Sequence, residues 1–303
     1  MADPIYSRFD NIFDSTGVKD QDEDFKCRWQ MKNKNFAIPV LMYHHVNPEG
    51  SFINVRPSLF ESQIKYLQGS GYTSLNTTDL LEIFNGTRNP PYKPVVITFD
   101  DGWLDNWLFA FPVLEKYGMK AIIFVVTSLI HEKGRRMRYD EGTVKGLPAP
   151  KECQQMVDSG SAQEVMLSWE EIREMENTGL IDIQSHTHTH QRWDKLYPDI
   201  KERIKTLNEE LKISKAIIEK RLKKQCNALC WPWGKYNDEY IEAARSSGYK
   251  LLFTTEKGTN TPETGTWKIK RIVIGNIGNM TLRKKLAVFS RDWLSKAYLK
   301  CFK

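Results

Sequence analysis

Apolar and polar positions along the chain predict strands and helices in turn. Residues 95–99 are a short apolar run rich in β-branched side chains, which indicates a strand buried on both faces. Residues 103–117 are expected to form a helix that ends before a glycine, and residues 121–126 form the next apolar run. This order of strand, helix and strand is typical of a parallel sheet or barrel, so the pattern predicts an α/β fold.

The same pattern extends over most of the chain. Strands are expected at residues 36–43, 228–230, 250–254 and 271–274, and helices at residues 58–68, 78–84, 169–178, 199–223 and 237–247. One continuous run of this kind favours a single domain over residues 36–303. Residues 1–35 are polar and show no apolar periodicity, so they are expected to be an extension.

Two segments depart from the pattern. Residues 131–165 are long and polar, and they are expected to be an inserted loop that is either a substrate-binding rim or a solvated insertion. Residues 282–298 place apolar and basic side chains at helical spacing, which predicts one helix. That helix either closes the domain or, through residues 282–303, makes weak contact with an anionic membrane surface.

The strongest candidate chemistry follows the central strand. Asp100 and Asp101 come directly after the apolar run, and Gly102 allows the chain to turn there. In α/β proteins the carboxyl ends of strands carry the functional site. Because two adjacent carboxylates repel each other, a bound cation is the simplest way to keep both ionised.

Further metal ligands are found after another apolar stretch. The segment Ser-His-Thr-His-Thr-His at residues 185–190 follows the apolar residues 180–183. Imidazole is the commonest metal ligand, and one carboxylate with two imidazoles leaves coordination positions open for water and substrate. The two segments together predict a catalytic type of metal site.

The Thr-Phe-Asp-Asp-Gly and His-x-x-x-His segments, in this order, resemble the polysaccharide deacetylases of carbohydrate esterase family 4, over roughly residues 39–274. The resemblance implies an incomplete (β/α)7 barrel. It also implies that Asp100 is the catalytic base and that Asp101, His186 and His190 bind a divalent metal, which is expected to be Zn²⁺. His188 matches no ligand position of the family.

The general acid departs from the usual family pattern. In the family a late histidine has that role, and here no histidine follows His190. The chain instead resembles a circularly permuted branch that includes poly-N-acetylglucosamine deacetylases, in which a Tyr-His pair near the start supplies the acid. Tyr43 and His44 match that pair, so His44 is the candidate acid and His45 the alternative.

The resemblance also implies roles for the aromatic residues of the segment 231–236. The backbone N–H of Trp233 corresponds to the group that stabilises the oxyanion, and Trp231 or Tyr236 is expected to stack on a sugar. These aromatic side chains could equally belong to the core. The family's arginine in this segment is Cys230 here, and Arg271 is expected to replace it by orienting Asp100.

Composition adds little that is specific. The chain has 303 residues and a net charge of +6, and no dense basic run or recognised module favours nucleic acid. The five cysteines are scattered and odd in number, which argues against a disulfide framework. Since the chain shows no secretory signal and no apolar stretch long enough to cross a membrane, a cytoplasmic or membrane-associated location is expected.

The sequence therefore predicts a metal-dependent hydrolase that removes N-acetyl groups from N-acetylhexosamine units of a polysaccharide or glycolipid precursor. Two other functions remain open at this point. One is a non-catalytic carbohydrate-binding barrel, and the other is an amidohydrolase of small molecules.

Overall fold

Seven strands form one curved parallel sheet in a computed structural model that describes residues 36–49, 53–132, 134–143 and 147–301. The strand order is β10-β1-β5-β6-β7-β8-β9, and β9 and β10 are not paired with each other within the described residues. The bounds are β1 Val40–Tyr43, β5 Pro94–Phe99, β6 Ala121–Val125, β7 Ile181–Ser185, β8 Ala228–Cys230, β9 Leu251–Phe253 and β10 Ile272–Val273. The predicted incomplete barrel is confirmed, whereas the predicted extension at 1–35 lies outside the described residues.

Three two-residue strands complete the β structure. Thr73–Ser74 (β4) pairs with the start of β5, and His45–Val46 (β2) pairs with Asn54–Val55 (β3) in a separate small sheet. The pairing between β2 and β3 lies immediately after the end of β1. It therefore fixes the chain at His45 beside the carboxyl ends of the central strands.

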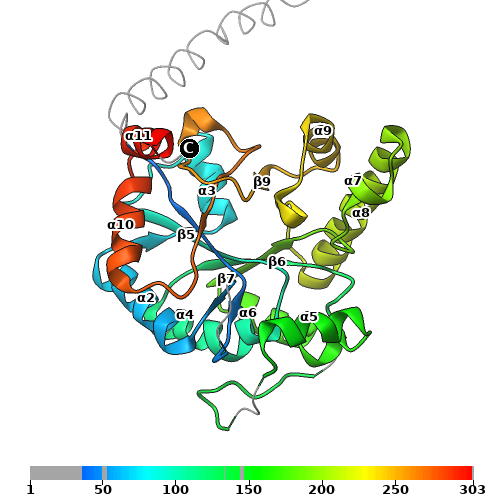
Figure 1. Ribbon diagram of the computed structural model, residues 1–303, viewed down its shortest axis with the longest axis horizontal. Helices are drawn as coiled ribbons and strands as arrows, with labels where there is room; N and C mark the ends of the chain where they lie inside the picture. Colours follow the sequence, from blue (N-terminus) through cyan, green and yellow to red (C-terminus); the bar gives the residue numbers. More distant parts are fainter. Residues whose placement is uncertain (1–35, 50–52, 133, 144–146, 302–303) are drawn as a thin grey trace, which may run out of the picture. The chain divides into compact units, whose positions relative to one another are not determined.

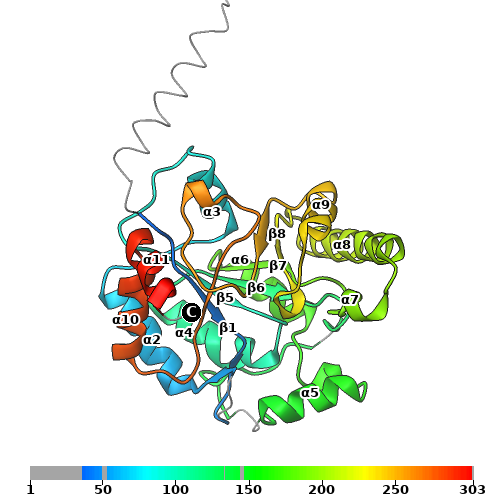
Figure 2. The ribbon, with the colours of Figure 1, turned by 45° about the horizontal axis from the view of Figure 1, so that its top comes forward.

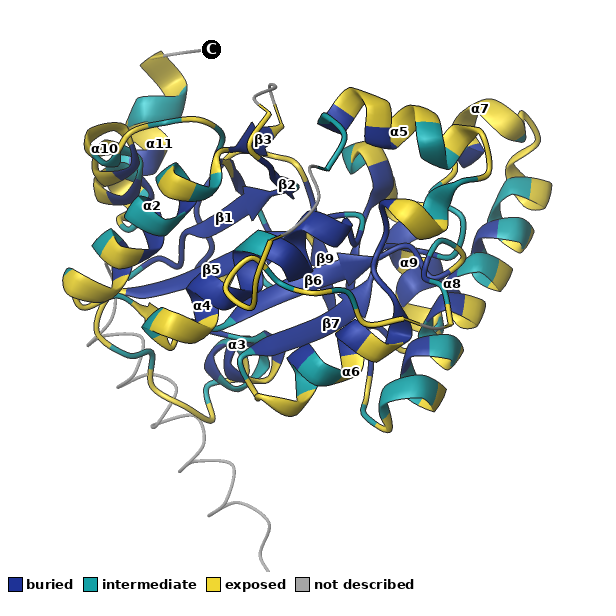
Figure 3. Cartoon of the chain, turned by 90° about the horizontal axis from the view of Figure 1, so that it is seen from below, coloured by how far each residue is buried: buried dark blue, intermediate teal, exposed yellow. Residues whose placement is uncertain are grey.

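The helices surround the strands (Figures 1 and 2). Their bounds are α2 Pro57–Gly69, α3 Thr77–Phe84, α4 Phe111–Tyr117, α5 Pro150–Asp158, α6 Trp169–Asn177, α7 Trp193–Leu196, α8 Ile200–Leu222, α9 Asp238–Ser246, α10 Asn279–Phe289 and α11 Asp292–Cys301. Every residue of β5 is buried, as expected for a strand covered on both faces, and Figure 3 shows the same contrast between buried strands and exposed outer helix faces. Among the described residues, no helix has the length and apolar character needed to cross a bilayer.

The segment predicted as an inserted loop contains regular structure. Residues 150–158 form α5, and residues 162–164 form a short 3₁₀ turn. Pro150 occupies the first turn of α5, and the Glu152 carboxylate accepts a hydrogen bond from the Ala149 N–H. The prediction of a loop without regular structure was wrong: Cys153 of α5 is buried in a hydrophobic cluster with Trp103, Val165 and Met166, and local sequence does not reveal such tertiary packing.

Two other helix predictions need correction. The predicted helix at 103–117 begins with a π-helical turn at Asn106–Ala110 before α4. The predicted single helix at 282–298 is two helices, α10 and α11, separated near Ser290. Trp293 continues the apolar helical spacing of this segment, yet it lies in the second helix and is 60% exposed. Contact of residues 282–303 with a membrane stays a prediction.

A buried charge cluster stabilises the sheet at the end opposite the candidate site. The Lys224 ammonium contacts the carboxylates of Glu176 and Asp182, and Asp182 also accepts a hydrogen bond of 2.6 Å from the Thr77 hydroxyl. We expect Lys224→Met to lower the free energy of unfolding by about 1–3 kcal/mol, because it leaves two carboxylates without their cation. Chemical denaturation measures this, with the exposed Lys220→Met as the control; equal stability of the two variants would contradict the expectation.

Candidate active site

The predicted metal ligands come together at the carboxyl ends of β5 and β7. The Oδ1 atom of Asp101 lies 3.3 Å from Nε2 of His186 and 3.5 Å from Nε2 of His190. The Nδ1 of His186 lies 2.9 Å from the Cys230 carbonyl oxygen. Because that oxygen can only accept, Nδ1 of His186 carries a proton, which leaves Nε2 as the ring nitrogen that faces Asp101 and could bind a metal there. These three side chains offer one carboxylate oxygen and two imidazole nitrogens, a donor set that fits a divalent transition metal.

The backbone around these ligands adopts unusual conformations. Asp101, Thr187, His190 and Trp233 all have positive φ angles between 57° and 75°, a region that side-chain-bearing residues seldom occupy. The only other described non-glycine residues with positive φ lie elsewhere, at Lys93 and Lys223. Strained backbone of this kind concentrates at functional sites, where the surrounding structure holds it.

Gly102 makes the turn that separates the two acids. Its φ is +88°, and a Cβ there would lie 3.1 Å from a methyl carbon of Val125. The turn therefore requires glycine for both its conformation and its space. It lets Asp100 and Asp101 face the same site although they are consecutive in sequence.

Asp100 forms a buried two-point ion pair with Arg271. Its Oδ1 and Oδ2 atoms lie 2.6 and 2.7 Å from the two terminal guanidinium nitrogens, and Arg271 is only 1% exposed. The guanidinium also donates to the Thr254 carbonyl oxygen and to the Cys230 thiol. Burial alone would raise the pKa of Asp100, but the Arg271 charge outweighs it and holds that pKa below its usual range.

Burial raises the pKa of a carboxyl such as Asp100 but lowers the pKa of an imidazole such as His190. Burial and the neighbouring His186 lower the pKa of His190 to about 4. Its imidazole is therefore neutral near pH 7 and free to donate a lone pair. Burial raises the pKa of Asp101, but hydrogen bonding and charge from the surrounding histidines prevail and keep that carboxyl ionised.

The two consecutive histidines after β1 have different environments. His44 is 21% exposed at its side chain, and its Nε2 lies 3.8 Å from Oδ2 of Asp100. His45 is 1% exposed, its Nδ1 lies 2.6 Å from the Asp105 carboxylate, and its ring packs on Trp103. The structure thus brings His44 to Asp100 and ties His45 to a separate carboxylate.

The three candidate aromatic side chains are also distinguished by their surroundings. Trp233 is 62% exposed, and its ring centroid lies 5.4 Å from that of His190. Trp231 is fully buried and packs against Tyr236 and Tyr240, so it has no exposed ring face for a sugar. Tyr236 is partly buried and lies outside the lining of the pocket described next.

A pocket of about 460 Å³ lies over these groups. Its lining includes the predicted residues His44, His45, Asp100, Asp101, His186, His190, Trp231 and Trp233. It also includes residues that the sequence analysis did not identify, namely Ile53, Trp103, Pro150, Lys151, Gln154 and Thr255. Of these residues, only Trp103 could have been found from the sequence, because it lies two residues after the Asp-Asp pair.

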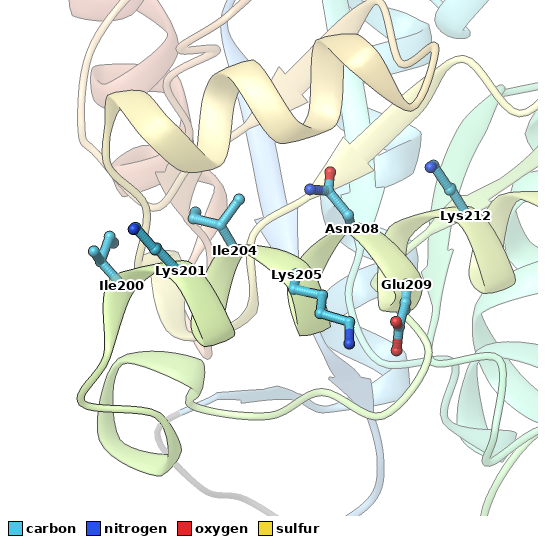
Figure 4. A pocket seen from close by; sticks show the side chains of 7 residues that line it. All are labelled: Ile200, Lys201, Ile204, Lys205, Asn208, Glu209 and Lys212. Atoms are coloured by element: carbon cyan, nitrogen blue, oxygen red, sulfur yellow. The ribbon is translucent and has the colours of Figure 1, made fainter.

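A second hollow lies along α8 and has a different character. It measures about 610 Å³ and is lined only by residues of that helix, including Lys201, Lys205 and Lys212 (Figure 4). The only carboxylate in its lining is Glu209, and it contains no histidine. It therefore lacks the acid, base and metal ligands found at the carboxyl ends of the strands.

Comparison with known proteins agrees with the fold. The family model for polysaccharide deacetylase matches residues 87–252. A Bacillus subtilis (strain 168) protein named as a polysaccharide deacetylase, YxkH, is 30% identical over 250 residues, which cover 82% of this chain and 76% of that protein. The poly-beta-1,6-N-acetyl-D-glucosamine N-deacetylase of Staphylococcus aureus (strain MRSA252) is 26% identical over 251 residues, covering 82% of this chain and 77% of the relative.

A solved structure shows the same architecture. Streptococcus pyogenes deacetylase PplD, in complex with acetate, superposes with a TM-score of 0.67 at 26% identity, covering 83% of this chain and 99% of that one. The incomplete parallel barrel carries, at the carboxyl ends of its strands, a group of one acid and two histidines that could hold a metal ion, and this arrangement is typical of a class of hydrolases. This chain belongs to the polysaccharide deacetylase family.

Proposed function

We propose that this protein removes N-acetyl groups from N-acetylhexosamine units of a polysaccharide or of a glycolipid precursor. One observation carries the proposal: a three-ligand metal site and a separate ionised carboxylate, Asp100, share one pocket. The similarity to a poly-beta-1,6-N-acetyl-D-glucosamine N-deacetylase supports the choice of substrate class. The reaction would hydrolyse the amide bond, releasing acetate and leaving a free amine on the sugar.

Asp101, His186 and His190 would hold the metal, for which Zn²⁺ is our candidate. The donor set of two imidazoles and one carboxylate supports this choice, since it leaves open positions of the kind that catalytic zinc sites have. When bound, the metal supplies Lewis acidity that polarises the amide carbonyl and lowers the pKa of the attacking water.

The other residues would handle protons and charge. Asp100 would accept the proton of the attacking water, and His44 would donate a proton from Nε2 to the departing nitrogen. The backbone N–H of Trp233 would donate to the developing oxyanion, a role that its position in the pocket lining and its left-handed conformation support. The exposed indole of Trp233 also offers a face on which a sugar ring can stack.

Arg271 would keep Asp100 ionised and correctly oriented. This role compensates for the family arginine that Cys230 replaces, and the two-point contact between guanidinium and carboxylate supports it.

Neither alternative function is supported as well. A non-catalytic carbohydrate-binding barrel has no use for a buried, ionised Asp100 beside a metal site. A small-molecule amidohydrolase needs an enclosed site, whereas Trp233 at this pocket is largely exposed. The proposed reaction does not depend on where the protein is located, and the location predicted from the sequence stays a prediction.

Metal removal tests the proposal directly. We expect the purified protein to release acetate from N-acetylglucosamine oligomers, to lose this activity on treatment with a chelator, and to regain it on addition of Zn²⁺. Quantification of acetate and of the new amine should give equal amounts. Acetate release that is unaffected by complete metal removal would contradict the metal assignment, and no release from any oligomer would contradict the function.

A pH profile tests the role of Arg271. Without the guanidinium, burial would dominate and raise the pKa of Asp100, so the base would become protonated at a higher pH. We therefore expect Arg271→Gln to shift the acidic limb of kcat/KM to higher pH. Arg271→Lys keeps a positive charge and should shift it less. An acidic limb at the same pH in both variants and in the wild type would contradict the role.

A further inference from the structure

Helix α5 forms one wall of the candidate active-site pocket. Pro150, Lys151 and Gln154 line the pocket together with His44 and Asp100. Figures 2 and 3 place α5 at the end of the sheet where β1 leads into the small strands β2 and β3. The segment that interrupts the alternation of strands and helices therefore contributes to the same site as the catalytic candidates.

Tertiary contacts anchor this wall to the metal site. Cys153, on α5, is 2% exposed and belongs to a hydrophobic cluster with Trp103, Val165 and Met166. The Trp103 indole N–H donates a 2.9 Å hydrogen bond to Oδ2 of Asp101. Just before the helix, the Pro148 carbonyl oxygen accepts a 3.0 Å hydrogen bond from the Asn47 side chain. The cluster that holds α5 thus includes a side chain bonded to a candidate metal ligand.

Lys151 is the only lysine or arginine among the described residues that line this pocket. Its side chain is exposed, and no hydrogen bond or ion pair holds it within the described part of the chain. The cation held beside the pocket by Asp100, Arg271, is neutralised by that carboxylate. Lys151 therefore presents an uncompensated positive charge to whatever enters the pocket.

The net charge of the assembled site is also positive. The carboxylate of Asp100 and the guanidinium of Arg271 cancel each other. A divalent ion held by Asp101 and two neutral imidazoles leaves one net positive charge, to which Lys151 adds another. A site with this charge favours a substrate that carries negative charge of its own.

We propose that Lys151 is a specificity-determining residue that binds an anionic substituent, a carboxylate or a phosphate, on the N-acetylated sugar or on the sugar beside it. This inference rests on the proposed deacetylase function and specifies the substrate class of the same site. Lys151 contacts the substituent and not the reacting amide, so it governs substrate choice.

The test compares matched substrates. Acetate release is measured with a neutral N-acetylglucosamine oligomer, with the same oligomer carrying a carboxylate, and with one carrying a phosphate. We expect the wild type to prefer at least one anionic oligomer by about tenfold in kcat/KM. Lys151→Gln should abolish that preference by raising KM for the anionic oligomer, with kcat and the neutral oligomer unchanged. The carboxylate and phosphate arms separate the two sources of charge.

Two controls distinguish recognition from a structural effect. Lys151→Arg should retain the preference because it keeps the charge, and Lys220→Gln, a change at an exposed lysine of α8, should leave it unaltered. The preference should also decrease as ionic strength rises, as screening of an exposed charge requires. Acetate release from all three oligomers with no preference, or a preference that survives in Lys151→Gln, overturns the inference alone. No release from any oligomer overturns the proposed function as well.

Discussion

Replacing Asp100 with asparagine is expected to lower kcat by about 10²- to 10⁴-fold, the usual cost of removing a general base. The amide cannot accept the proton of the attacking water, yet it has nearly the shape of the carboxylate. Since Asp100 pairs with Arg271 and the metal ligands are Asp101 and two histidines, metal content should be unchanged. Elemental analysis and steady-state kinetics on the same preparation measure both quantities.

The matched control is the neighbouring acid. Asp101→Asn removes the only carboxylate from the three-ligand group, so it should weaken metal binding itself, and activity should recover in part at high Zn²⁺ concentration. Asp100→Asn should show no such recovery. Equal metal affinity in the two variants would contradict the separation of roles. A thermal melt checks folding, because Asp100→Asn leaves the buried Arg271 without a charged partner.

Replacing His44 with alanine is expected to reduce turnover by about 10²- to 10⁴-fold while leaving zinc content intact. A general acid is needed to expel the amine but not to bind the metal. His44 lies 3.8 Å from Asp100 and is partly exposed, so it can reach a substrate bound between them. The alkaline limb of the kcat/KM profile should disappear in His44→Gln, because that limb reports loss of the acidic proton.

His45 provides the contrasting variant. Its buried ring is held by Asp105 and Trp103, so His45→Ala should reduce stability, and an alkaline limb should remain in its pH profile. The free energy of unfolding and the pH profile together separate the two histidines. Full activity in His44→Ala, with loss of the alkaline limb in His45→Ala, would transfer the role of acid to His45.

Most of the fold could be predicted from the sequence because it depends on local patterns. The fully buried β5 appears as an uninterrupted apolar run, and α8 appears as long helical spacing ending in basic residues. In a parallel sheet the carboxyl ends of strands meet at one edge. That rule predicts that the two motifs share one site, and the resemblance then selects Asp101, His186 and His190, which do lie together.

The predictions that failed depended on contacts between distant segments. The helix α5 forms where the sequence predicts a loop, since Cys153 is buried in a hydrophobic cluster that includes Trp103, some distance earlier in the chain. Trp293 continues the apolar helical spacing of its segment, yet it lies in α11, after the break that follows α10, and is exposed. Spacing shows which side chains share a face of an element, but not what that face meets.

The sequence by itself determined the parallel fold, because strand burial and turn chemistry are local properties. The resemblance carried by its two motifs predicted the metal ligands and the different roles of the two acids, and these roles stay predictions. Only the tertiary structure distinguished His44 from His45 and the exposed Trp233 from the buried Trp231. It also brought Lys151 to the pocket. Each of these outcomes depends on where a side chain points. These side chains lie beyond the end of a strand or on an inserted helix, and packing against residues far away in sequence sets their direction.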